Sequence, residues 1–154
     1  MQAVIYINNS LRKKLQSLVE FLSQVNKGFD AVAEEVDNAN LKSAMMAVAV
    51  ESKQYAREIS NQLNLWEITN TAEGVENIWT KIEASVQEQA GLAKGDEIVA
   101  LCNNCESYFS KLYEDALQEY FPYKNLKDII TYQLYAAQCA FMKIRLLNNL
   151  RFSN

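Results

Sequence analysis

Apolar side chains recur at helical spacing between Asp96 and Tyr120, and this stretch constrains the fold more than any other part of the chain. The steps of three and four residues join Ile98, Leu101, Cys102, Cys105, Phe109, Leu112 and Ala116. Such steps place side chains on one face of an α-helix. The stretch therefore predicts a long amphipathic helix, over residues 96–121, that must pack against other helices.

The composition extends this expectation to the whole chain. Its 154 residues include only four glycines and one proline, and nearly half are apolar. A turn-rich β fold needs more glycine and proline, whereas long helices need few of either. The length fits one domain, over residues 1–154, with a single core. We expect an all-α protein.

Similar apolar patterns predict further helices over residues 10–36, 41–65 and 125–151, and a shorter one over 74–90. Residues 37–40 have the composition of a tight turn, and Asn40 is a suitable cap for the helix that follows. So short a turn makes the first two helices antiparallel neighbours. The shorter helix is interpreted as a crossover between two hairpins of an antiparallel four-helix bundle. Small side chains on the second helix predict a close approach by a partner helix; they are Ala44, Ala47, Ala49 and Ala56.

Charge and cysteine content narrow the classes of partner and the compartment. The net charge of −4 disfavours nucleic acid, because neutralising phosphates requires a basic face. No apolar run is long enough to predict a membrane span, and the start lacks the pattern of a signal peptide. Three cysteines, an odd number, fit a reducing compartment. A cytoplasmic protein is expected.

Several short patterns occur together in one order along about Leu15 to Asn149. They are Lys27-Gly28-Phe29, Ala33-Glu34-Glu35-Val36, Leu41-Lys42, Glu51 with Tyr55-Ala56 and Glu58, Trp79, and Cys102 with Glu106, Tyr113 and Ala116-Leu117. In these patterns the chain resembles the ferritin-like superfamily and, within it, an uncharacterised bacterial family of four-helix-bundle proteins of unknown function. The resemblance implies a ferritin-like fold with a helical crossover.

The resemblance also implies where a di-metal site would lie. The superfamily uses a Glu from each of two helices and a Glu-x-x-His pair from each of the other two. This chain has no histidine. Asn26 stands where the family commonly has an acidic residue, Phe141 where it has a histidine, and Ala136 at the position that matches Glu51 in the second hairpin. We therefore expect neither a metal nor a cofactor.

Three carboxylates nevertheless keep a metal site open as an alternative. Glu51 and Glu106 are the candidate ligands, with Glu58 or Gln133 in support, since hard cations accept oxygen ligands without imidazole. The other interpretation makes these residues edges of amphipathic helices, in contact with solvent or with a cation. The candidate cations are Lys53, Arg57, Lys111 and Arg145.

Cys102 and Cys105 form a C-x-x-C pattern, which raises the alternatives of a thiol-based stress sensor or a zinc site. A redox pair normally lies at a helix N-terminus, and a zinc site needs further ligands, for which only Cys139 is present. Both thiols fall in mid-helix on the apolar face, so core packing is favoured. Without histidine or a glycine-rich loop, we expect no enzyme activity.

Aromatic residues are frequent in the two last long helices and between them. The cluster consists of Tyr108, Phe109, Tyr113, Tyr120, Phe121, Tyr123, Tyr132 and Tyr135. Tyr108 and Tyr113 lie off the central apolar seam, and Tyr132 and Tyr135 flank Gln133, a polar residue on the inner face that needs a partner. Aromatic side chains outside a core are enriched at interfaces. We therefore predict a homodimer through these two helices; the alternative is that the rings only thicken the core.

Overall fold

The computed structural model describes residues 8–65, 77–88 and 96–151, and in these ranges the chain is helical with short connections and contains no strand. The helices are α1 (Asn9–Glu34), α2 (Ala39–Leu65), α3 (Ile78–Glu88), α4 (Asp96–Leu117) and α5 (Lys124–Arg151). The prediction of an all-α fold is confirmed. None of these helices combines the length and the hydropathy that crossing a bilayer requires.

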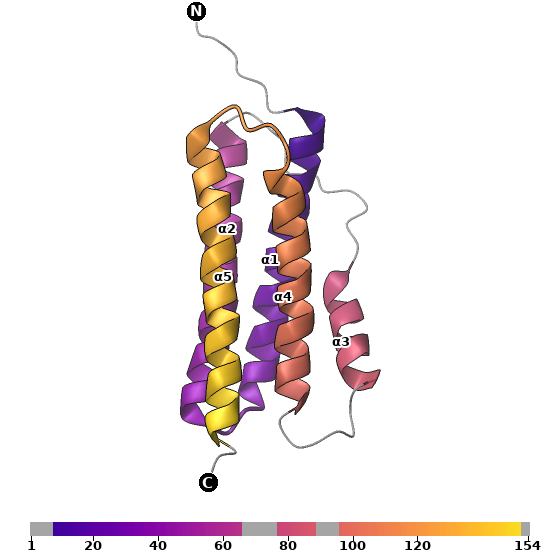
Figure 1. Cartoon of the computed structure of the whole chain (residues 1–154), viewed down its shortest axis with the longest axis vertical. Helices are drawn as coiled ribbons and strands as arrows, with labels where there is room; N and C mark the ends of the chain where they lie inside the picture. The colour runs from indigo at the N-terminus through magenta and orange to yellow at the C-terminus, as the bar shows by residue number, and fades with distance from the viewer. Residues whose placement is uncertain (1–7, 66–76, 89–95, 152–154) are drawn as a thin grey trace, which may run out of the picture.

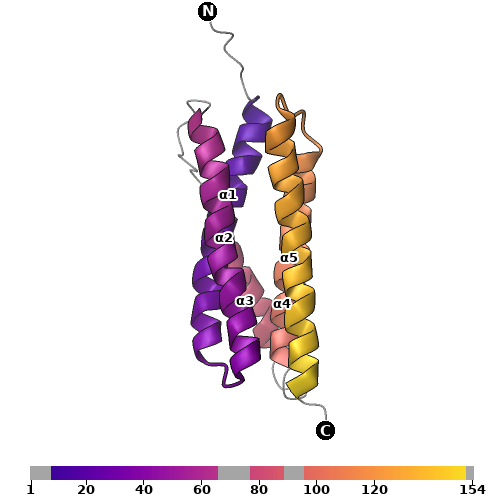
Figure 2. The ribbon, with the colours of Figure 1, turned by 90° about the vertical axis from the view of Figure 1, so that its left-hand side faces the viewer.

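Four long helices lie side by side along the long axis of the molecule (Figures 1 and 2). α1 packs against α2 and α4, and α5 packs against the same two helices. α1 and α5 run in one direction and α2 and α4 in the other, so neighbours are antiparallel (Figure 1). α2 ends at the opposite end of the bundle from the start of α4 (Figure 1). The chain therefore crosses back along the bundle between them, and α3 lies on this return against α1 and α4.

The helix caps explain where the first hairpin turns. The Asn8 side chain accepts a hydrogen bond from the Leu11 amide at 2.7 Å and begins α1. The Asn38 side chain accepts one from the Leu41 amide at 3.0 Å. The prediction that Asn40 caps the second helix is therefore wrong. Because α2 begins at Ala39, Asn40 already lies in its first turn and an earlier asparagine takes the cap position.

The other boundaries shift by a few residues. α1 ends at Glu34, two residues before the predicted end. α4 ends at Leu117, four residues before the predicted end, and Pro122 lies beyond it as expected, because proline cannot continue a helix. α5 begins at Lys124, one residue early. Of the predicted 74–90 helix, residues 78–88 are helical, and residues 74–76, 89 and 90 lie outside the described part of the chain.

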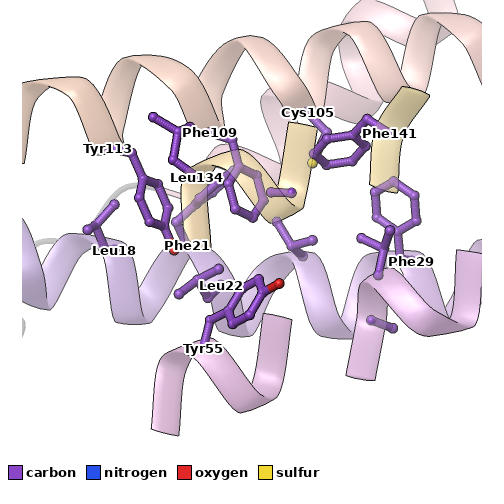
Figure 3. Packing of buried hydrophobic residues seen from close by; sticks show 14 of the residues in the cluster. Leu18, Phe21, Leu22, Phe29, Tyr55, Cys105, Phe109, Tyr113, Leu134 and Phe141 are labelled. Carbon is purple, nitrogen blue, oxygen red and sulfur yellow. The ribbon is translucent and has the colours of Figure 1, made fainter. Parts of the chain in front are cut away.

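Aromatic rings from three helices meet in the core (Figure 3). Phe109 of α4 lies with its ring centroid 5.1 Å from Phe21 of α1 and 5.5 Å from Phe141 of α5. Phe141 also contacts Phe29, at 5.9 Å. Edge-to-face and tilted pairs at these distances add to the stability gained from burying the rings. The interior around Phe141 is therefore filled by apolar atoms.

α3 is held on the α1 and α4 face through Trp79. Its ring packs at 5.7 Å from Phe29, and its backbone amide donates to the Gln24 side chain at 3.1 Å. Gly28 lies under the ring, and a Cβ atom at this position would lie 2.0 Å from the nearest ring carbon. Only glycine leaves room for the indole here, because no other residue lacks a Cβ atom.

Candidate functional site

A buried glutamine joins three helices through one hydrogen-bonded network. The Tyr113 hydroxyl of α4 donates to the Gln133 carbonyl oxygen at 2.8 Å. The Gln133 amide in turn donates to the backbone carbonyl of Tyr55 at 3.3 Å and to the Glu58 carboxylate at 3.4 Å, both on α2. The expected need of Gln133 for a partner is therefore confirmed. Such a network orients α2, α4 and α5 relative to one another.

Tyr113 differs from its predicted position. It was expected off the apolar seam, but its side chain is fully buried and stacks on Phe109 with ring centroids 5.4 Å apart (Figure 3). The prediction failed because Gln133 supplies a polar partner inside the core, so the phenol can be buried at low cost. Burial raises the pKa of Tyr113 well above its ordinary value, and the charges of Tyr55 and Glu58 raise it further. The hydroxyl therefore remains a donor.

The three candidate carboxylates have separate surroundings. Glu106 forms an ion pair with Arg145 at 2.7 Å, one of the pairings considered above. Glu58 accepts from Gln133 and from Gln54. Glu51 is exposed on α2. In the described ranges no three residues among histidine, cysteine, aspartate and glutamate come together as a possible metal site.

The positions at which the sequence departs from the ferritin-like pattern have other partners. Phe141 packs between Phe29 and Phe109 in the aromatic core. Asn26 donates from its side-chain amide to the backbone carbonyl of Ala49 at 2.7 Å. Ala136 lines a cavity between α2 and α5. Each of these side chains makes a packing or hydrogen-bonding contribution to the bundle.

The two C-x-x-C thiols are packed in the core. Cys102 and Cys105 are reduced and fully buried, as predicted, whereas Cys139 is exposed. Burial raises the pKa of Cys102 to about 12, although Arg145 opposes this shift. Burial also raises the pKa of Cys105 well above its ordinary value. Because the thiolate is the reactive form, neither buried cysteine is activated at neutral pH.

A cavity of about 320 Å³, open to solvent on one side, lies between α2 and α5. Its lining consists of Ala44, Ala47, Glu51, Tyr55, Tyr132, Ala136, Cys139, Ala140 and Lys143. Small residues at Ala44 and Ala47 predicted a close helix approach, but here they leave space instead. The sequence signal that could have revealed the cavity is the presence of alanines on both facing helices.

Beside this cavity α5 carries an apolar stripe, which we call the α5 stripe. It consists of Tyr132, Tyr135, Cys139, Met142, Leu146 and Leu150. Its large side chains are between 54% and 66% exposed. Met46 and Val50 of α2 are exposed as well. The steps of three and four residues place the whole stripe on one face of the helix.

No family model, curated protein or solved structure matches this chain.

Proposed function

We propose that this chain is a non-catalytic, ferritin-like helical bundle of the bacterial cytoplasm that serves as a structural or protein-interaction module and forms a homodimer. The antiparallel neighbours and the crossover with α3 support the ferritin-like assignment (Figure 1). Phe141 and Ala136, at the positions where the resemblance implies a metal ligand, support the loss of metal chemistry.

The α5 stripe is the observation that carries self-association. Seven large apolar side chains are exposed on α2 and α5: Met46, Val50, Tyr132, Tyr135, Met142, Leu146 and Leu150. At roughly 100 Å² each they offer an area close to the ~800 Å² that a standard interface buries on each partner. A second copy related by a twofold axis can present the same stripe, so the surface can pair with itself. The predicted interface also included α4. Of its aromatic residues Phe109 and Tyr113 are buried, and Tyr108 is half-buried and packs against the core, so the proposed interface uses α5 and α2.

Light scattering coupled to gel filtration tests this proposal. At about 100 µM the native chain should elute with twice the monomer mass, and a Tyr135→Glu/Leu146→Glu variant with the monomer mass, because it places charge in the stripe. Tyr120→Glu is the matched control, since Tyr120 is 76% exposed and lies outside the stripe. A native chain that remains monomeric at this concentration would overturn the proposal.

The two alternatives have less support. A carboxylate metal site would need Glu51 and Glu106 together, but Glu106 is already paired with Arg145. Stoichiometric iron or manganese in freshly purified protein would support this alternative.

A thiol sensor would need a reactive Cys102 or Cys105, and both are buried. We expect only Cys139 to react rapidly with a thiol reagent in the native state, and rapid labelling of three thiols would contradict this.

A further inference from the structure

The cavity between α2 and α5 is elongated and has two different ends. Tyr55 and Tyr132 share one end, because Gln133, next to Tyr132, donates to the Tyr55 carbonyl. The two helices are antiparallel, so Ala44 and Lys143, each eleven positions away from these tyrosines, share the other end. At 1.5 Å per residue the cavity is about 16 Å long. Its volume of about 320 Å³ is in the range of small-molecule sites.

The Tyr55 hydroxyl is a polar group that the bundle itself does not use. The residue is only 7% exposed, and its hydroxyl forms no hydrogen bond with a described residue. Among the described residues no buried side-chain nitrogen or oxygen lacks a partner, so this hydroxyl is open to the solvent in the cavity. Its ring lines the cavity, and the hydroxyl points away from Tyr113 (Figure 3). Burial raises the pKa of Tyr55 to about 12, and Glu51, Tyr132 and Glu58 contribute, so the phenol stays neutral. A hydroxyl that faces a cavity and has no partner in the described chain can donate to, or accept from, a molecule that binds there.

The charges around the tyrosine end of the cavity determine whether a cation or an anion binds there. Glu51 lies one helical turn before Tyr55 on the same face of α2 and lines the same cavity. A carboxylate beside two aromatic rings attracts a cation, which can lie over a ring face while its N–H groups donate to oxygen. Lys143, at the far end, disfavours a second positive charge there. Alanine side chains line the length between the two ends.

We propose that this cavity binds a small organic ammonium ion with an apolar tail. The ammonium group lies between Glu51, Tyr55 and Tyr132, and the tail extends along Ala47, Ala136 and Ala140. The cavity excludes dications because Lys143 would face their second charge. Tyr132 and Cys139 belong both to the α5 stripe and to the cavity lining, whereas Tyr135 and Leu146 belong to the stripe alone. Binding can therefore be measured in the Tyr135→Glu/Leu146→Glu variant, in which no second copy covers the shared residues.

Titration with hexylammonium, followed by NMR of the labelled chain, tests the site directly. We expect saturable binding in the millimolar range or tighter, with shifts confined to the lining residues. Hexanoate and hexane-1,6-diammonium should bind at least about fivefold more weakly, because the first meets Glu51 and the second meets Lys143. Equal binding of hexanoate, or no shift with about 10 mM hexylammonium, would overturn the proposal.

Substitutions identify the groups responsible. Glu51→Gln should weaken hexylammonium binding about fivefold and Tyr55→Phe about threefold, through loss of a charge and of a hydrogen-bond partner respectively. Glu20→Gln, an exposed carboxylate on α1, is the control and should leave binding unchanged. Equal binding by the native chain and Glu51→Gln would contradict the inference. The Tyr135→Glu/Leu146→Glu variant should bind at least as tightly as the native chain, because no second copy covers Tyr132 and Cys139 in it. Failure of dimerisation and failure of binding are therefore separable.

Discussion

The two opposite faces of this bundle differ in whether a further helix packs on them. On one face, α3 packs against both α1 and α4 (Figure 1). On the other face no described helix lies over α2 and α5 (Figure 2), and the cavity lies between these two helices. The first face is closed by fitting the large Trp79 against Gly28, the residue with no side chain. On the second face alanines line the cavity from both helices, and the large residues Tyr55 and Tyr132 lie at only one end of it.

This difference shows that small residues between helices do not by themselves close a groove. At Gly28 a ring from a third helix occupies the space, whereas at Ala44 and Ala136 nothing in the described chain does. The open face also carries the α5 stripe, whose exposure to water is unfavourable in an isolated monomer. Side chains of a third helix therefore fill the closed face, whereas the open face retains a cavity and exposed apolar side chains.

The largest expected effect contrasts the core with the open face. Phe109→Ala removes a ring that contacts Phe21 and Phe141 and should cost about 3–5 kcal/mol of unfolding free energy. Tyr132→Ala, on the open face, should change the stability of the monomer by less than about 0.5 kcal/mol. Urea denaturation, with both proteins in the Tyr135→Glu/Leu146→Glu background, measures the two values. Similar losses would show that the two faces contribute equally to the fold.

The next effect tests how the closed face is sealed. In an ordinary helix interior Gly→Ala stabilises by about 1 kcal/mol. At Gly28 the added methyl would clash with Trp79, so Gly28→Ala should instead destabilise by about 1–3 kcal/mol. The fluorescence of Trp79 should also shift to the red. It is measured in a Trp66→Phe background, so that Trp79 is the one tryptophan that emits. Lys27→Ala, on an exposed neighbour, is the control, and a gain in stability for Gly28→Ala would contradict this packing.

A smaller effect depends on pH. In the folded chain the pKa values of Tyr55 and Tyr113 lie above the ordinary tyrosine value of 10.0, and the pKa of Cys102 lies above the ordinary thiol value of 9.0. The unfolded chain therefore loses protons first, and stability should be complete below about pH 9 and fall as the pH rises toward 12. Tyr113→Phe should cost about 1–2 kcal/mol at pH 7, because Gln133 loses its donor. Its stability should then decline less steeply above pH 10, and parallel declines would contradict the assignment.

Periodicity was sufficient to predict the helices and most of the core. Every predicted helix overlaps an observed one, because apolar residues at steps of three and four can be buried together only in a helix. The thiols Cys102 and Cys105 were placed correctly for the same reason. Partners distant in the sequence were not predictable in this way. The burial of Tyr113 depends on Gln133, twenty residues along the chain, and on the register between α4 and α5.

The alanines on both facing helices indicate where a cavity can form, but they do not predict that it forms, because this depends on the distance between the two helix axes. Alanines on α2 permit a close approach, but bulky side chains elsewhere in the core, such as Phe109 and Phe141, determine how near α5 can come. The sequence narrowed the ion-pair partner of Glu106 to four candidate cations and no further. Choosing Arg145 required knowledge of which residues of α4 and α5 lie opposite each other.

The smallest expected effect concerns this pair, which joins α4 to α5. Glu106 and Arg145 are 24% and 26% exposed, so water screens their attraction. Partly exposed pairs contribute about 0–1 kcal/mol, and the arginine retains the Asn103 side chain as an acceptor if the carboxylate is lost. Glu106→Gln should therefore lower the unfolding free energy by less than about 1 kcal/mol, and addition of salt should reduce the difference further. A large loss of stability that metal chelation of the native chain reproduces would instead identify Glu106 as a ligand, because breaking an ion pair with Arg145 responds to salt and not to a chelator.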